Sequence, residues 1–246
     1  MEINQYLCNV KQQKKDTTME KKYKLTDETI ELNGKTLHRI ECVIPFGDVK
    51  KGEKGGFVES EYNLSHDDNA WVYDNAKVHG HAKVCGNAKV RGNALVFGSA
   101  EVFGDAKVYG NALVFGNAEV YDNAKVYGFA QVFGVAWVGG DAWVGGDAEV
   151  FGNAKVRGNA LVYGSVTIRG NAIVTKREDY IVFKNNWSSG RYFTYTKSND
   201  MWSVGCFYGS GKELIERAYK DSEVSGKHYE AYVKFVENLK AIHPVS

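Results

Sequence analysis

Apolar residues recur at a fixed spacing between residues 69 and 176 of this chain. Over these 108 residues the phrase Asn-Ala-x-Val-x-Gly repeats eighteen times without an insertion. Its second position is Ala in every unit except at Val166, and its fourth is Val in every unit except at Ile168. Residues two apart lie on the same side of a strand, because strand side chains alternate. The pattern predicts a short strand in each hexad with both apolar groups pointing inward.

The polar ends of each hexad predict a corner between successive strands. Gly in the sixth position and Asn or Asp in the first tolerate φ > 0, which a β-branched residue resists. Three corners close a triangle, so eighteen residues form one coil and the repeat forms six coils. At about 4.8 Å per coil the stack is roughly 29 Å tall. An uninterrupted hexad is typical of a β-solenoid.

The phrase resembles the hexapeptide-repeat superfamily, whose members wind into a left-handed parallel β-helix. The resemblance covers about half the chain and rests on an aliphatic residue followed four places later by a small one, as from Val90 to Ala94. The left hand is implied by this resemblance, since the period alone does not determine it. The lead-in at residues 55–60, then residues 63–66, then the hexads are similar to the YdcK-like proteins of enterobacteria, gut bacteria and their phages, often labelled transferases. That label follows the fold, and a fold does not imply a function.

A β-hairpin is expected ahead of the repeat, within residues 25–54. Residues 29–32 and 35–40 alternate apolar and polar side chains on either side of Asn33-Gly34, a strong hairpin signal. A parallel solenoid leaves unpaired backbone groups at its ends. The hairpin is therefore predicted to cap the first coil.

The β-helix itself is expected to occupy residues 55–176, with regular hexads from residue 69. Val58 and Leu64 fall at the spacing of Ala70, which indicates that the helix begins one irregular coil early. Residues 1–24 show no period, and we expect a loosely ordered extension there.

Residues 177–246 are expected to form a small α+β domain. Three strands are predicted at residues 180–183, 192–196 and 201–207. One helix is predicted to open with a capping box between Ser210 and Glu213, and a second to span residues 227–242. The predicted role is a cap on the far end of the solenoid. A ligand site is the alternative, because this domain holds Trp187, Arg191, Tyr195 and Trp202.

Residues eighteen apart stack directly, so outward positions sort into three faces. The first, the phenylalanine face, carries apolar residues at strand and corner positions: Leu95, Phe97, Leu113, Phe115, Phe133 and Phe151, with Phe129 and Val135 at the corners. An exposed apolar strip of this size on a soluble protein usually marks an interaction site. We expect it to form an oligomer or partner interface, or to receive the C-terminal domain. The alternative is that stacked aromatics only shield one another. The resemblance favours a homo-oligomer, a trimer or a dimer.

The second face, the basic face, interleaves cations and aromatics: Lys89, Arg91, Lys107, Tyr109, Lys125, Tyr127 and Trp143. This face is a candidate for ligand binding, because such a pattern suits a phosphate backbone with stacked bases. The rival is a solvated face whose Lys stems cover the rings. With 31 basic and 30 acidic side chains, the chain has almost no net positive charge to attract nucleic acid. The solvated face is therefore the favoured interpretation.

The third face, the mixed face, includes Glu101, Phe103, Tyr121 and Trp137. Gly139 lies two places after Trp137, and Gly145 has the same place after Trp143 on the basic face. These glycines predict notches beside each indole, which are either ligand platforms or a plain loss of side chains.

Cysteine usage and the N-terminus bear on the compartment. The four cysteines stand far apart without a Cys-x-x-Cys pair, which favours a reduced protein. The N-terminal residues are polar and rich in Lys, without an apolar signal core, and no stretch has the length to cross a bilayer. A cytoplasmic protein without a membrane partner is predicted, in the host cytoplasm if a phage encodes it.

The resemblance to acyltransferases implies a His base and a loop that builds the acyl-donor site. General-base catalysis needs that His within reach of substrate. All eighteen hexads run in phase, so no loop leaves the coils. His79 and His81 are therefore only weak candidates for a catalytic base. An enzyme is not favoured, and no cofactor is expected.

Zinc is the other chemistry that the superfamily implies, because its carbonic-anhydrase branch binds zinc through three His. His66, His79, His81 and Cys85 cluster in the sequence and are suitable ligand types. The triangle directs His79, His81 and Cys85 to different faces and corners, so no metal site is predicted.

The sequence as a whole favours a non-catalytic binding or scaffold protein that acts through solenoid faces on an unknown protein partner. The resemblance adds a phage or mobile-element origin. The alternatives are an acyltransferase of the hexapeptide class and a nucleic-acid or nucleotide binder.

Overall fold

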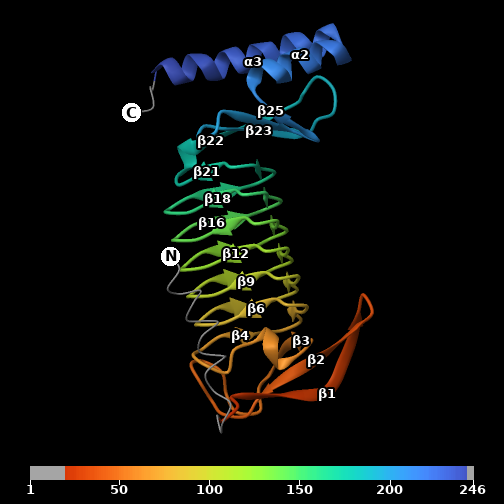
Figure 1. Ribbon diagram of the computed structural model, residues 1–246, viewed down its shortest axis with the longest axis vertical. Helices are drawn as coiled ribbons and strands as arrows, with labels where there is room; N and C mark the ends of the chain where they lie inside the picture. The colour runs from red at the N-terminus through yellow and green to blue at the C-terminus, as the bar shows by residue number, and fades with distance from the viewer. Residues whose placement is uncertain (1–19, 243–246) are drawn as a thin grey trace.

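The structure is a computed structural model that describes residues 20–242. It is a parallel β-solenoid of about seven turns with a hairpin at one end and a small α+β region at the other (Figure 1). The predicted fold class is confirmed. The expected extension at residues 1–24 lies mostly outside the described residues.

The N-terminal hairpin has the predicted turn. Strand β1 (Tyr23–Leu32) pairs antiparallel with β2 (Lys35–Cys42). Asn33 and Gly34 have φ of 51° and 75°, the left-handed values that a two-residue hairpin turn requires. Strand β2 pairs with β3 (Lys54–Val58), and β3 continues into the sheet of the phenylalanine face. The hairpin thus extends one sheet of the solenoid, and its buried residues Tyr23, Ile40 and Cys42 also pack into the solenoid core at that end.

The irregular first coil is confirmed, but its register differs from the prediction. Val58 pairs with Val78 and Leu64 with Val84, an offset of twenty residues, whereas regular coils repeat every eighteen. Val58 and Leu64 therefore extend the inward valine columns and not the alanine columns. The short 3-10 helix at Glu61–Asn63 belongs to this coil.

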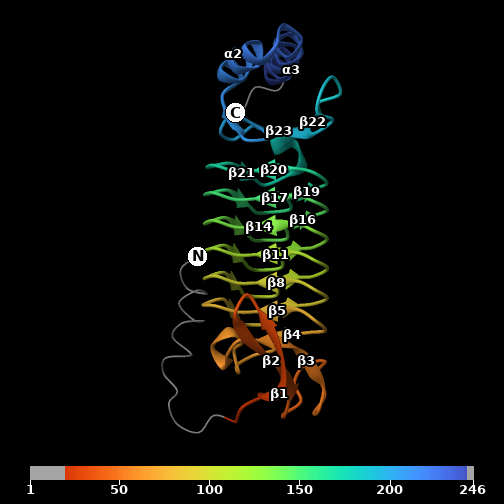
Figure 2. The same cartoon turned by 90° about the vertical axis from the view of Figure 1, so that its right-hand side faces the viewer.

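Three sheets form the sides of the solenoid, as Figure 2 shows from the phenylalanine face. That face holds β5 (Lys77–Val78), β8 (Leu95–Val96), β11 (Leu113–Val114), β14 (Gln131–Val132), β17 (Glu149–Val150) and β20 (Thr167–Ile168). The basic face holds β4 (Trp71–Val72), β7 (Lys89–Val90), β10 (Lys107–Val108), β13 (Lys125–Val126), β16 (Trp143–Gly145) and β19 (Leu161–Tyr163). The mixed face holds β6 (Lys83–Val84), β9 (Glu101–Val102), β12 (Glu119–Val120), β15 (Trp137–Val138), β18 (Lys155–Val156) and β21 (Ile173–Val174).

Alanine and valine columns fill the interior, as the sequence predicts. Ala118 and Val120 are fully buried, and Val120 pairs in register with Val102 and Val138. A side chain is crowded at most of the glycine corners: a Cβ on Gly116, whose φ is 73°, would lie 3.0 Å from the backbone of Gly134.

The C-terminal region begins after the 3-10 helix Arg177–Asp179. An antiparallel sheet of four strands underlies two helices (Figure 1). Its elements are β22 (Tyr180–Lys184), β23 (Tyr192–Thr196), β24 (Met201–Val204), β25 (Phe207–Gly209), α2 (Gly211–Asp221) and α3 (Glu223–Ile242).

Two predicted boundaries in this region are wrong. The third predicted strand is split, because a turn containing Gly205 with φ of 53° divides β24 from β25. The second helix begins at Glu223, four residues before the predicted start. The capping box is confirmed, since the Ser210 hydroxyl accepts from the Glu213 amide at 3.3 Å.

Side chains of the C-terminal region form hydrogen bonds with backbone groups near the end of the solenoid. The Thr167 amide donates to the Thr194 hydroxyl at 3.2 Å, and the Ile173 amide donates to the Ser198 hydroxyl at 2.7 Å. The Tyr180 hydroxyl donates to the Leu161 carbonyl at 2.8 Å. These contacts cover edge groups that would otherwise pair with another chain.

Substitutions that change side-chain volume should differ in their effect on stability between the alanine and the valine columns. Ala118→Leu should lower the free energy of unfolding at least as much as Val120→Ala, because overpacking opens a corner whereas truncation leaves a small cavity of about 1–3 kcal/mol. Denaturant titration of both variants under identical conditions measures this. A neutral Ala118→Leu beside a severe Val120→Ala would show that the alanine column is not crowded.

Candidate functional sites

The rings of the phenylalanine face form one continuous stack. Successive ring centroids are 5.3, 4.9, 4.8 and 4.6 Å apart, from His79 through Phe97, Phe115 and Phe133 to Phe151. The guanidinium carbon of Arg169 lies 5.7 Å from the Phe151 centroid and continues the column. We call this column the ring stack.

Exposed apolar surface on this face lies beside the ring stack. The stacked phenylalanines and Leu95 and Leu113 are half-buried, because each ring covers its neighbours. Phe129 is 62% exposed and Val135 43% exposed, and they flank Phe133 on one coil. Mutual shielding thus accounts for much of the burial of the stacked rings, whereas the two corner residues present exposed apolar surface.

At both ends of the ring stack, residues from other parts of the chain form hydrogen bonds. The Glu59 carboxylate, one coil before His79, accepts from the Gly80 amide at 2.6 Å and from Lys35 Nζ at 2.8 Å. At the far end, Arg169 Nε donates to the Ser203 hydroxyl at 3.2 Å. The expectation that the C-terminal domain docks along this face is wrong, because that domain contacts the stack at its end.

His79 is buried, although the sequence predicts a surface histidine. Only 7% of it is exposed, its ring covers Phe97, and its Nδ1 has no hydrogen-bond partner within residues 20–242. Burial lowers its pKa, an effect that nearby Lys35 adds to and Glu59 opposes. His81 lies exposed at the next corner, edge-on to Tyr62. The structure does not bring these two candidate bases to one site.

Several cations of the basic face already have partners. Lys89 Nζ lies 2.7 Å from an Asp48 carboxylate oxygen, and Asp48 also accepts from the Tyr73 hydroxyl at 3.0 Å. Arg91 lies over the Tyr73 ring at 4.3 Å.

Farther along the same face, Lys125 Nζ lies 3.9 Å from the Trp143 ring centroid. Tyr109 and Tyr127 stack at 5.3 Å, and Lys107 is exposed. Cationic side chains that lie over aromatic rings fit the solvated face that the sequence favours.

The two glycine notches are filled by tyrosines of the preceding coil. A Cβ built on Gly139 would lie 2.3 Å from Cζ of Tyr121, and one on Gly145 would lie 2.3 Å from Cζ of Tyr127. The rings occupy the space that the glycines leave. The interpretation of these notches as open ligand platforms is therefore wrong.

The four residues considered for zinc remain apart. The His66 ring stacks on Tyr23 at 4.1 Å, and Cys85 packs with Phe103 and Tyr121 on the mixed face. Cys85 is disulfide-bonded, so the expectation that all four cysteines are reduced is wrong. Within residues 20–242, no group of three or more His, Cys, Asp or Glu side chains is arranged to hold a metal ion.

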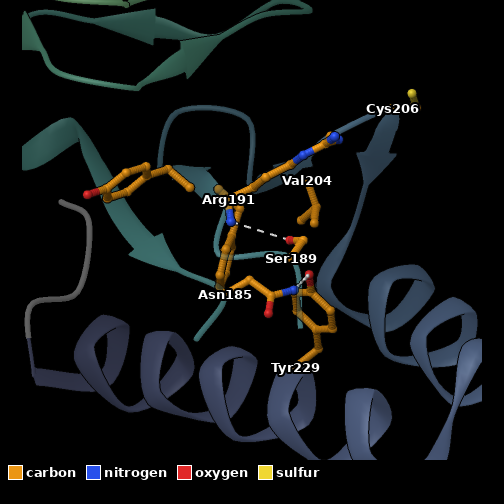
Figure 3. A pocket seen from close by; sticks show the side chains of 9 residues that line it. Asn185, Ser189, Arg191, Val204, Cys206 and Tyr229 are labelled. Atoms are coloured by element: carbon orange, nitrogen blue, oxygen red, sulfur yellow. Dashed lines mark hydrogen bonds between the residues drawn. The ribbon is translucent and has the colours of Figure 1, made fainter. Parts of the chain in front are cut away.

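A small pocket lies in the C-terminal domain between the sheet and α3 (Figure 3). Its volume is about 240 Å³, and its lining is Asn185, Ser189, Arg191, Tyr192, Phe193, Val204, Gly205, Cys206 and Tyr229. Of the four residues that the sequence singles out here, only Arg191 lines it. Tyr195 and Trp202 are each 1% exposed and belong to the core, with Trp187 packed against that core.

Comparison with models of known protein families and with curated protein sequences finds no match. No helix within residues 20–242 has both the length and the apolar character needed to cross a membrane. The cytoplasmic location stays a prediction.

Acid should destabilise the fold through His79. Because burial holds the pKa of His79 below its ordinary 6.5, the unfolded chain takes up this proton first as the pH falls. The free energy of unfolding should therefore decline below about pH 6.5. His79→Phe removes this loss, so between about pH 7 and about pH 5 it should lose less stability than the wild type. Urea titration at both pH values measures the difference, and equal losses would contradict the argument.

Filling the Gly139 notch should cost stability by displacing Tyr121. Gly139→Ala should lower the free energy of unfolding by about 1–3 kcal/mol, because Tyr121 is buried and has little room to move. A double-mutant cycle with Tyr121→Ala measures the coupling. In the Tyr121→Ala background the added methyl should cost much less. An equal cost in both backgrounds would show that the ring does not occupy the notch.

Proposed function

We propose that this chain is a non-catalytic binding or scaffold protein that presents the phenylalanine face to a protein partner. The observation that carries the proposal is the pair of exposed apolar corners, Phe129 and Val135, on the coil of Phe133. The same corners elsewhere on this face carry Asn, Asp, Ser or His. Polar corners suit a solvated solenoid, whereas apolar corners gain from burial against another surface.

A second copy of the chain is the partner that we favour. The ring stack is half-buried, and the two corners widen it into an apolar patch at one coil. An interface around a twofold or threefold axis buries the same patch on every copy, so one apolar patch serves all subunits. The resemblance to hexapeptide-repeat proteins supports the same proposal, with a trimer or a dimer as the assembly.

The resemblance also supports the origin that we propose, in a phage or another mobile element. The YdcK-like layout of the lead-in and the hexads carries that part of the proposal. The transferase label attached to such proteins adds little, because it follows the fold.

Acyl transfer and nucleic-acid binding have less support from the described residues. A general base needs an accessible imidazole, and the His79 ring is largely covered. A phosphate-binding face needs available cations, and Lys89, Arg91 and Lys125 are engaged with Asp48 or with rings.

Self-association can be tested by a charge at the exposed corner. Phe129→Asp should convert the assembled protein into a monomer, because burial of an unpaired carboxylate opposes the contact. The control is Tyr163→Asp on the basic face, where a ring 61% exposed is replaced in the same way. Light scattering at several concentrations gives the mass of each protein. A wild type that stays monomeric, or a Phe129→Asp variant with the wild-type mass, would contradict the proposal.

A further inference from the structure

The pocket in the C-terminal domain has a one-sided hydrogen-bonding character. Asn185 Oδ1 already accepts from the Ser188 amide at 2.9 Å and from the Ser188 hydroxyl at 3.3 Å. Asn185 Nδ2 donates to the Tyr229 hydroxyl oxygen at 3.3 Å (Figure 3). The Ser189 hydroxyl accepts from the Arg191 amide at 3.3 Å. The Asn185 oxygen is therefore fully engaged, and the Ser189 and Tyr229 oxygens each accept one hydrogen bond.

The same side chains can still donate hydrogen bonds. Within the described part of the chain, no acceptor is assigned to the Tyr229 hydroxyl proton or to the Arg191 guanidinium. The Ser189 hydroxyl can donate a hydrogen bond while its oxygen accepts the one from Arg191. Tyr229 is 8% exposed, and burial raises its pKa, so its hydroxyl stays protonated and able to donate. Asp221 is the nearby acid that adds to this shift.

The charge and the walls of the pocket narrow the class of ligand. Arg191 is the only charged residue of the lining, so the pocket has a cation and no carboxylate. Guanidinium pairs well with planar oxyanions, above all with carboxylates. Phe193, Tyr192 and Val204 supply apolar wall beside these donors. At about 240 Å³ the space lies below the roughly 300–1,000 Å³ of pockets for drug-sized ligands, so the ligand must be small.

We propose that this pocket binds a small carboxylate with an apolar body, held by Arg191, Ser189 and Tyr229 against the wall of Phe193 and Val204. The carboxylate supplies acceptors to the guanidinium and the two hydroxyls, and the apolar body contacts the ring and the branched side chain. Figure 3 shows Asn185, Ser189 and Tyr229 close together, with the Arg191 backbone nitrogen hydrogen-bonded to the Ser189 hydroxyl and the Arg191 side chain extending toward Cys206. This site is separate from the phenylalanine face, so it is independent of the proposed function.

Titration calorimetry of the full chain with benzoate tests the proposal, and inorganic phosphate serves as the oxyanion without an apolar body. Benzoate should bind more tightly than phosphate. Arg191→Gln should weaken benzoate binding by about tenfold or more, as expected for a lost charge-assisted hydrogen bond. Tyr229→Phe should weaken it by a smaller factor. The matched control Arg157→Gln, at an exposed position on the solenoid, should bind as the wild type does.

The outcomes separate the site from a general effect of charge. Circular dichroism first establishes that each variant is folded, and the exposed Arg191 is suited to substitution even if Tyr229→Phe unfolds the domain. The proposal is overturned if the wild type does not bind benzoate, or if Arg191→Gln binds it as the wild type does. Tighter binding of phosphate than of benzoate also overturns it, because the apolar wall then contributes nothing.

Discussion

Hydrogen bonding of each coil to the next in one register is the constraint on which the rest of the solenoid depends. The Leu113 amide donates to the Ala130 carbonyl at 2.9 Å, and the Phe115 amide donates to the Val132 carbonyl at 3.0 Å. Every regular coil repeats this pattern, so residues eighteen apart lie directly above one another. Each side chain therefore has a known neighbour along the column, and one inward column can be valine throughout because all its members meet the same environment.

The outward columns acquire their properties from the same register. Where one column repeats Phe, the rings stack at 4.6 to 4.9 Å and shield one another. Where Tyr is followed by Gly eighteen residues later, as at Tyr121 and Gly139, the ring leans over the glycine. An apolar residue that breaks a polar column, such as Phe129, has no like neighbour to cover it and stays exposed. Exposed apolar surface therefore arises where a polar column is interrupted.

The sequence predicts what the register controls and misses what depends on contacts between distant segments. The inward columns, the three faces and the turn at Asn33-Gly34 follow from local spacing. The offset of the first coil does not, because Leu64 and Val72 are eight residues apart, two more than a hexad, and no hexad pattern places the extra residues.

Burial of His79 also escapes local reasoning, since it depends on stacking against Phe97 and on the neighbouring hairpin. The C-terminal pocket joins Asn185 on one loop to Tyr229 on a helix 44 residues later, and no motif links them. Arg191 belongs to the aromatic segment that the sequence singles out, but the other residues of the pocket lining are not among those it singles out.

Deletion of one coil is the most direct test of the account. Removal of residues 111–128 takes out eighteen residues, so the coils on either side should join in register, with Phe97 stacked on Phe133. Removal of residues 111–127 takes out seventeen and turns every later inward side chain outward. Thermal unfolding followed by circular dichroism should show a cooperative transition for the first deletion and none for the second. Equal behaviour of the two deletions would contradict the claim that an eighteen-residue register holds the fold together.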